Sequence, residues 1–223
     1  MKQQFDVRLC STGQHKEMLD QVLDFFNIRA DYSLDIMRPN QTLALVTQLA
    51  LVGIDSVLSD FNPDLVIVQG DTTTAFIGAL AAFYRNIKIA HVEAGLRTGD
   101  IYSPFPEEAN RVFISKIANY HFAPTEKSAN NLINEGVNKN NIFVVGNTVT
   151  DSVIIASKSV GAVNHKFDKI DLNKKVILVT AHRRENLGEG IDSIALAIKN
   201  IAEGRDDVEV VFPVHLNPKV RDV

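Results

Sequence analysis

Two short apolar runs that each end in a polar cluster are the feature that most constrains how this chain can fold. The runs are 65–68 (LVIV), followed after Gln69 by GDTTT, and 87–90 (IKIA), followed by HVEAG. A helical segment of about a dozen residues separates them, which is the pattern of parallel strands covered on both faces. Ligands bind beyond the carboxyl ends of such strands. We therefore expect both polar clusters to contribute to a site.

The remaining sequence repeats this alternation and predicts an α/β protein with Rossmann-like, doubly wound parallel sheets. A loop is expected at 31–39 and a longer one, with two glycines and two prolines, at 95–106. Expected strands are 5–12, 65–68, 87–92, 120–123, 141–145, 176–180 and 208–212, and expected helices are 16–26, 43–61, 72–84, 107–118, 126–135, 148–160 and 191–202.

Composition narrows the functional classes. The chain has 223 residues, 45% of them hydrophobic, and a formal charge of -4 without a Lys/Arg-rich run, which argues against nucleic acid or an anionic membrane as the partner. Its single cysteine, Cys10, excludes an internal disulfide and favours a reducing compartment, so a cytoplasmic location is expected. We identify no apolar stretch of 18 residues and no leader peptide, and so predict no membrane span.

The change in composition at 161–174, where periodicity is lost and charge increases, predicts a linker between two domains. The expected division is a first Rossmann-like domain at 1–160, a linker at 161–174 and the start of a second Rossmann-like domain at 175–223. A sheet of two strands cannot bury both faces. We therefore expect a fragment that lacks one strand-helix unit at its start and most of the second domain.

Four acidic residues follow the predicted strands and the long loop. Asp71 suits either a catalytic carboxylate or a helix cap. Glu93 follows an apolar run and would be partly withdrawn from water, a setting that suits a general acid or base; it would equally suit an anchor for the 95–106 loop. Glu107 and Glu108 begin a helix, where acidic residues also complement the helix dipole.

A second cluster lies in the second domain. His182, Arg183 and Arg184 follow a predicted strand and would suit an anionic pyrophosphate; alternatively they form a basic surface cluster. Neither GxGxxG nor GxxxxGK[ST] occurs, which disfavours kinases, ATPases and simple NAD enzymes. His91 and Glu93 share one side of a strand, but two ligands do not make a metal site, so no metal is predicted. His215 is a lone histidine in a loop, for which the sequence pattern favours a structural or peripheral role.

The motifs together resemble a known family. The segments TGQHKEMLDQVLDFF, GDTTTAFIGALAAFY, HVEAGLRTGDIYSPFPEEANR, GNTVTDSV, TAHRRENLGEG and PVHLNP, in this order, are similar to the bacterial non-hydrolysing UDP-N-acetylglucosamine 2-epimerases. The resemblance covers essentially the whole chain, and the HVEAGLRT and PEEANR pair is highly specific. It implies a glycosyltransferase-B architecture of two Rossmann-like domains, here with an incomplete second domain.

The resemblance implies interconversion of UDP-GlcNAc and UDP-ManNAc by elimination and re-addition of UDP through 2-acetamidoglucal, without a cofactor. It carries catalytic roles to Asp71, Glu93, Glu107 and His182, and substrate-binding roles to Arg111, Arg183 and Arg184. Some relatives bind a second UDP-GlcNAc as an activator, and the matching positions are Gln14, Gln41, Arg183 and His215. The intact family member is expected to be a homodimer.

The chain also departs from the family pattern, because family members begin with a strand leading to a GTRPE-like turn that is not found here. We therefore expect little or no epimerase turnover from the 223-residue polypeptide. The alternatives are a hydrolysing 2-epimerase that releases ManNAc and UDP, a transferase of the same architecture, or a catalytically inactive binding or dimerisation fragment. A transferase needs at most one base, so the three carboxylates argue against it.

Overall fold

A computed structural model describes residues 4–14, 16–38, 40–159, 170–180 and 189–213. The chain divides into two compact units, Met1–Ala156 and Ser157–Val223, and each is described by itself. The division falls within one helix, four residues before the boundary expected from composition. Most of the predicted 161–174 linker lies outside the described residues.

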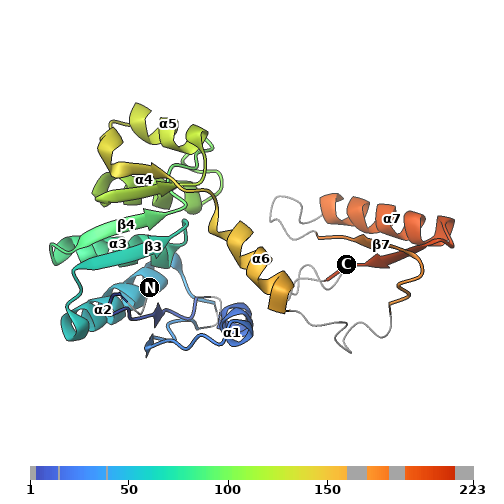
Figure 1. Cartoon of the computed structure of the whole chain (residues 1–223), viewed down its shortest axis with the longest axis horizontal. Helices are drawn as coiled ribbons and strands as arrows, with labels where there is room; N and C mark the ends of the chain where they lie inside the picture. The colour runs from blue at the N-terminus through green and yellow to red at the C-terminus, as the bar shows by residue number, and fades with distance from the viewer. Residues whose placement is uncertain (1–3, 15, 39, 160–169, 181–188, 214–223) are drawn as a thin grey trace. The chain divides into compact units, whose positions relative to one another are not determined.

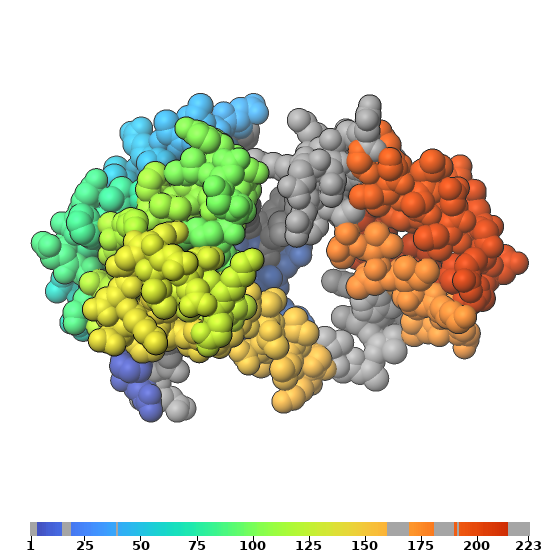
Figure 2. Space-filling model, turned by 90° about the horizontal axis from the view of Figure 1, so that it is seen from above, coloured from blue at the N-terminus to red at the C-terminus, as the bar shows by residue number. Residues whose placement is uncertain are grey.

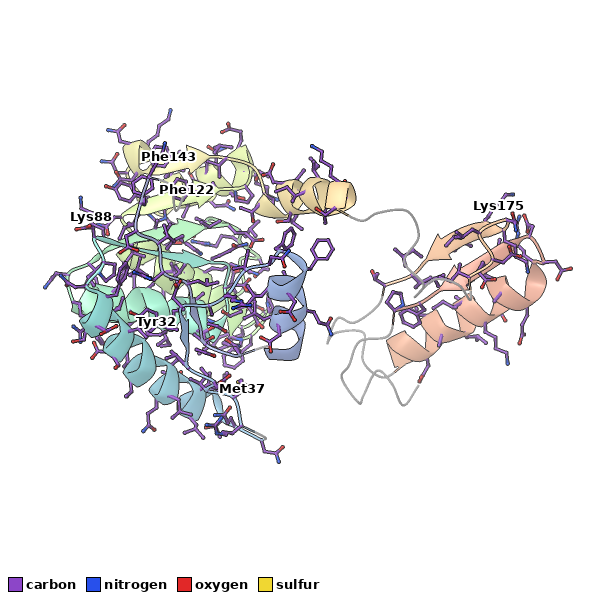
Figure 3. All side chains as sticks on the ribbon, turned by 60° about the horizontal axis from the view of Figure 1, so that its bottom comes forward. Tyr32, Met37, Lys88, Phe122, Phe143 and Lys175 are labelled. Carbon is purple, nitrogen blue, oxygen red and sulfur yellow. The ribbon has the colours of Figure 1, made fainter. Side chains whose placement is uncertain are left out.

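A four-stranded parallel sheet organises the first unit (Figure 1). Its strands, in spatial order, are β3 (Leu65–Gln69), β4 (Lys88–Val92), β5 (Tyr120–Ala123) and β6 (Ile142–Val144). Neighbouring strands are all parallel and follow one another in sequence. Phe122 of β5 lies beside Phe143 of β6, with ring centroids 5.6 Å apart (Figure 3). The predicted α/β class with parallel sheets is confirmed.

The helices of the first unit are α1 (Lys16–Phe25), α2 (Leu43–Phe61), α3 (Thr73–Tyr84), α4 (Glu107–Ile117) and α5 (Glu126–Asn134), with a 3-10 turn at Lys139–Asn141. Helix α6 (Thr148–Ser159) begins in this unit and contains the boundary after Ala156. Helix α3 packs on β3 and β4 and also contacts α2 and α4. In the described part of the chain, threonine hydroxyls cap three helix starts: Thr42 accepts from the amide of Leu45, Thr72 from that of Ala75 and Thr125 from that of Ser128. Threonine 72, and not Asp71, therefore caps α3.

Helix α2 corrects one expectation. Among the described residues it is long and apolar enough to cross a membrane by length and composition, so an apolar stretch of 18 residues does exist. Its stripe Val46, Ala50, Ile54 and Leu58 recurs every fourth residue and joins the core with Ile77 and Ile89. One side of α2 therefore packs into the core of the first unit.

The beginning of the chain also differs from expectation. Only Cys10–Ser11 (β1) forms a strand within the predicted 5–12, because its partner is the two-residue strand Tyr32–Ser33 (β2), which lies in the predicted loop 31–39. The Leu9 carbonyl accepts from the amide of Tyr32 at 3.0 Å, and the Leu9 amide donates to Asp31 at 2.8 Å. Strand alternation in sequence could not show how short this partner is. Strands β1 and β2 form a separate two-stranded sheet.

The described part of the second unit is a small parallel pair with one helix. Strands β7 (Lys175–Leu178) and β8 (Val208–Val211) pair in register, and α7 (Glu189–Gly204) connects them. Arg205 and Lys175 both bond to Asp207, and these bonds lower the pKa of its carboxyl to about 2. This is the βαβ unit that the sequence predicts.

A close approach of two chain segments fixes where β4 leaves the sheet. Gly95 follows β4 with φ +85, and its carbonyl accepts from the side-chain amide of Asn131 at 2.9 Å. A Cβ at Gly95 would lie 2.8 Å from the carbonyl carbon of Ser128 and 3.0 Å from the Leu132 side chain. Both the backbone angle and the space therefore require glycine.

Substituting Gly95→Ala should destabilise the first unit by at least ~3 kcal/mol, because a left-handed backbone strain is added to a collision with helix α5. Gly99→Ala is the matched control: Gly99 has φ +88, but a Cβ there meets nothing within 4 Å, so strain alone should cost about 1 kcal/mol. Urea unfolding followed by far-ultraviolet circular dichroism measures both. Equal losses would show that the approach of Ser128 is unimportant.

Candidate functional site

An ion-pair bridge joins the end of β3 to helix α4. Arg111 donates from Nε and Nη2 to Oδ2 of Asp71, at 2.9 and 2.5 Å, and from Nη1 to Oε2 of Glu108 at 2.7 Å. The Arg111 and Glu108 side chains are 14% and 3% exposed. A planar guanidinium can serve two carboxylates at once, and charge-assisted bonds out of water are strong. The bridge fixes Asp71 relative to α4.

The backbone of Asp71 is held from the same helix. The side-chain amide of Asn110, itself buried, donates to the Asp71 carbonyl at 2.8 Å. Residues 110 and 111 are adjacent on α4, so one helical turn secures both the main chain and the side chain of Asp71. Both Arg111 bonds go to Oδ2, and no bond to Oδ1 is present within the described part of the chain.

Glu93 lies beside this bridge in an unusual backbone conformation. It follows β4 with φ +68, a region that residues other than glycine rarely adopt and that often marks functional positions. Its Oε2 lies 3.7 Å from where a Cβ on Gly70 would be, so its carboxylate reaches the end of β3 next to Asp71. Among described residues it makes no hydrogen bond or ion pair. The alternative reading of Glu93 as a loop anchor is not supported by any such bond.

Glu107 is the first residue of α4, one position before the bridge. It is partly buried, and within the described ranges its carboxylate has no hydrogen bond or ion pair. Asp71, Glu93 and Glu107 thus come from the ends of β3 and β4 and the start of α4. Among the described residues Glu93 and Glu107 have no partner, whereas Asp71 is held by Arg111.

The 95–106 loop is tied down on both sides. Arg97 donates to both carboxylate oxygens of Glu135, at 2.6 and 2.9 Å, and to the hydroxyl of Ser115 at 2.8 Å. The Arg97 bond lowers the pKa of Glu135. Glu108 accepts from the amides of Thr98 and Gly99. Figure 2 shows the green 95–118 segment next to the yellow-green and yellow 120–145 segment on one face of the unit.

A buried histidine lies beneath the site. His91 is 0% exposed, and its Nε2–H donates to the Gly70 carbonyl at 2.8 Å. It is the register partner of His121 on β5, and among described residues the Nδ1 atoms of both rings have no partner. Burial lowers the pKa of His91 to about 4, against the opposing effect of the Gly70 bond. The neutral ring therefore holds the peptide that precedes Asp71.

The other predicted residues divide into two groups. Gln14 accepts from the Thr74 hydroxyl at 2.7 Å, at the start of α3, and Gln41 bonds within its own loop, to the Arg38 amide and the Ile36 carbonyl. His182, Arg183, Arg184 and His215 lie outside the described residues. The predicted roles of all of these residues, and of the carboxylates, stay predictions.

Two organising residues were missed from sequence. The sequence predicted only a helix-dipole role for Glu108 and no role for Asn110. In the structure Asn110 bonds to the Asp71 carbonyl, and Glu108 bonds to the Arg111 that holds the Asp71 carboxylate. The available signal was spacing: Glu108 and Arg111 are three apart on a helix and so face the same side. Within the described ranges, no group of three His, Cys, Asp or Glu residues could hold a metal ion.

Comparisons with known proteins identify the family of the chain. Residues 1–223 match the protein family described as UDP-N-acetylglucosamine 2-epimerase. The chain is 52% identical to the UDP-N-acetylglucosamine 2-epimerase of Campylobacter jejuni, over 96% of this chain and 58% of that protein. The chain thus spans about three-fifths of the length of this relative.

Two solved structures are similar as well. The crystal structure of the Neisseria meningitidis UDP-GlcNAc 2-epimerase bound to UDP-GlcNAc has a TM-score of 0.90 and 48% identity, covering 99% of this chain and 62% of that one. The Methanocaldococcus jannaschii UDP-GlcNAc 2-epimerase in complex with UDP-GlcNAc and UDP has a TM-score of 0.80 and 35% identity, covering 99% and 61%. The parallel α/β fold is therefore shared with these proteins over the matched part.

Lowering the pH should destabilise the first unit because the unfolded state binds the His91 proton more tightly than the folded state does. With the folded pKa at about 4 and the unfolded pKa near 6.5, stability is lost as pH falls between these values, by up to about 3 kcal/mol. Urea unfolding at a series of pH values measures this. His91→Gln, which can still donate to Gly70, should give a flatter dependence; an unchanged slope would contradict the assignment.

Proposed function

Because the chain belongs to the UDP-N-acetylglucosamine 2-epimerase family, we propose that it supplies the acid/base carboxylates for the reversible inversion of C2 in UDP-GlcNAc. The observation that carries the proposal is the placement of Asp71 and Glu93 at the carboxyl ends of adjacent parallel strands, with Glu107 beginning the next helix. Ligands bind at this edge of such sheets. UDP-GlcNAc and UDP-ManNAc are the proposed substrate and product.

The proposed reaction explains why several carboxylates are needed. The C2 proton is not next to a carbonyl, so direct deprotonation is too costly. Instead a base removes the C2 proton while the C1–O bond breaks, giving 2-acetamidoglucal and UDP. UDP oxygen then attacks C1, and an acid returns a proton to the opposite face of C2, so proton carriers are required on both faces.

The described contacts are compatible with proton exchange by carboxylates on both faces of C2. Glu93 and Glu107 make no competing hydrogen bond with described residues, so both can exchange protons. Asp71 keeps one oxygen on Arg111, and no described residue bonds to the other. The departing pyrophosphate needs cationic donors, and His182, Arg183 and Arg184 are proposed for that role from the sequence pattern.

Two other activities use the same substrate class. A hydrolysing epimerase would release ManNAc and UDP, and a transferase of similar architecture would require an acceptor. Proton NMR of the products separates these outcomes, because only the proposed reaction leaves an intact UDP-sugar that is inverted at C2.

A hybrid enzyme tests the proposal directly. In this hybrid, the chain replaces the segment that it matches in the Neisseria meningitidis protein, while the unmatched segments remain. We expect UDP-ManNAc to form and, in deuterated water, deuterium to enter C2. Glu93→Gln should lower kcat by on the order of 10²- to 10⁴-fold, because an amide cannot exchange the proton. Thermal unfolding should be unchanged.

The control is Glu126→Gln, the same chemical change at an exposed position in the first turn of α5, which should leave kcat unchanged. A folded hybrid that does not turn over UDP-GlcNAc would overturn the proposed function. The 223-residue chain by itself is expected to give little or no product, and normal turnover by it would contradict that expectation.

We also propose that the protein forms a homodimer, as the family resemblance implies. Helix α3 contacts both α2 and α4, and these three helices expose large apolar side chains: Val52 at 67%, Tyr84 at 64%, Phe83 at 52% and Phe113 at 45%. Apolar surface of this kind on adjoining elements is typical of a protein interface, and aromatic residues dominate interface energetics.

Replacing Phe83→Ser should weaken self-association at least about tenfold, because an aromatic contact is removed from the interface. Sedimentation velocity over a concentration series of the hybrid measures the dimer dissociation constant. Tyr102→Ser removes an exposed aromatic side chain from the 95–106 loop and should leave association unchanged. Equal weakening by both substitutions would locate the interface elsewhere.

A further inference from the structure

The buried carboxylate of Glu108 has no role in the acid/base chemistry described above. The residue is 2% exposed, and both of its carboxylate oxygens accept from specific donors. Its Oε1 accepts from the amides of Thr98 at 2.9 Å and Gly99 at 3.3 Å, and its Oε2 accepts from Nη1 of Arg111 at 2.7 Å. A buried charge is costly unless it is paired and hydrogen-bonded, and here it is both.

These donors keep Glu108 ionised. Burial raises the pKa of its carboxyl, but the bonds from Arg111 and from the two loop amides lower this pKa by more. The net pKa is therefore below its ordinary value. An ionised carboxylate that is enclosed and triply hydrogen-bonded is poorly suited to taking a proton from a substrate. It is well suited to holding a guanidinium in one orientation.

The orientation of Arg111 matters because its other two donors hold Asp71. The guanidinium is planar, so fixing Nη1 on Glu108 also fixes the direction in which Nε and Nη2 point. Both of those atoms bond to Oδ2 of Asp71. Glu108 is therefore connected to Asp71 through one rigid group, and to the 95–106 loop through two backbone amides.

The neighbouring glutamate has the opposite surroundings. Glu107 makes no hydrogen bond or ion pair with the described residues, whereas Glu108 is fully engaged. Resting on the proposed function above, we infer that Glu108 is a positioning residue: it orients Arg111 against Asp71 and ties Thr98 and Gly99 to α4. The two adjacent glutamates thus divide the work, and Glu107 alone of the pair exchanges protons.

In the hybrid enzyme, Glu108→Gln should lower kcat by on the order of 10²-fold with little change in KM, because a displaced Asp71 loses its productive geometry. The amide places either a weaker acceptor or an N–H donor against Nη1 of Arg111. The pH profile of kcat should keep both of its limbs. Loss of one limb would show that Glu108 itself titrates in the reaction and would overturn the inference.

A double-mutant cycle tests the route through Arg111. In an Arg111→Met background, Glu108→Gln should change kcat by less than about threefold, because the group that transmits its effect is absent. Glu126→Gln, applied in both backgrounds, is the matched control and should have no effect in either. An equal loss from Glu108→Gln in both backgrounds would show that Glu108 acts by another route.

Thermal unfolding of the 223-residue chain separates failure of this inference from failure of the proposed function. Glu108→Gln should lower Tm by about 5 °C or more when Arg111 is present, and should raise Tm or leave it unchanged in the Arg111→Met background, where a lone buried charge is removed. An inactive hybrid with this Tm pattern overturns only the epimerase proposal. A Tm unaffected by Glu108→Gln overturns the positioning role whatever the activity.

Discussion

The site of this protein depends on a single guanidinium that bonds to two carboxylates. Arg111 joins Glu108, on its own helix, to Asp71, which follows the strand β3. Asp71 and Arg111 are 40 residues apart in sequence, so this bridge, together with the bond from Asn110 to the Asp71 carbonyl, aligns the end of β3 with the start of α4. Ion pairs of this kind are worth most where water is excluded, and Arg111 is 14% exposed.

Around this bridge the structure separates held groups from available ones. Asp71 and Glu108 are engaged with Arg111, and Arg97 is engaged with Glu135, so these residues define positions. Glu93 and Glu107 have no such bonds among the described residues, and Glu93 has a left-handed backbone. The proposed transfer of a proton to and from carbon would need both kinds of group: rigid ones to set geometry and unpaired ones to react.

Beneath the polar layer, the core performs a second positioning task. His91 is enclosed between neighbouring strands and donates to the carbonyl of Gly70, while the amide of Gly70 donates to Val92. Burial keeps the ring neutral, so it can remain in the core without a counter-ion. Two elements therefore fix the turn that carries Asp71. Strand β4 holds Gly70 through His91 and Val92, and helix α4 holds Asp71 through Asn110 and Arg111.

Sequence by itself determined the parallel α/β architecture, because apolar runs and helix periodicity at 65–68, 72–84 and 87–92 are local patterns. It also placed Asp71 and Glu93 at strand ends and Glu107 at a helix start. Only the tertiary structure decided which carboxylates are paired, since that depends on contacts such as Asp71 with Arg111, which no local pattern encodes. The same reason explains the short β1–β2 pair, because strand length is set by a partner distant in sequence. The contact of Glu108 with Arg111 is local, but the bond that extends it from Arg111 to Asp71 spans 40 residues.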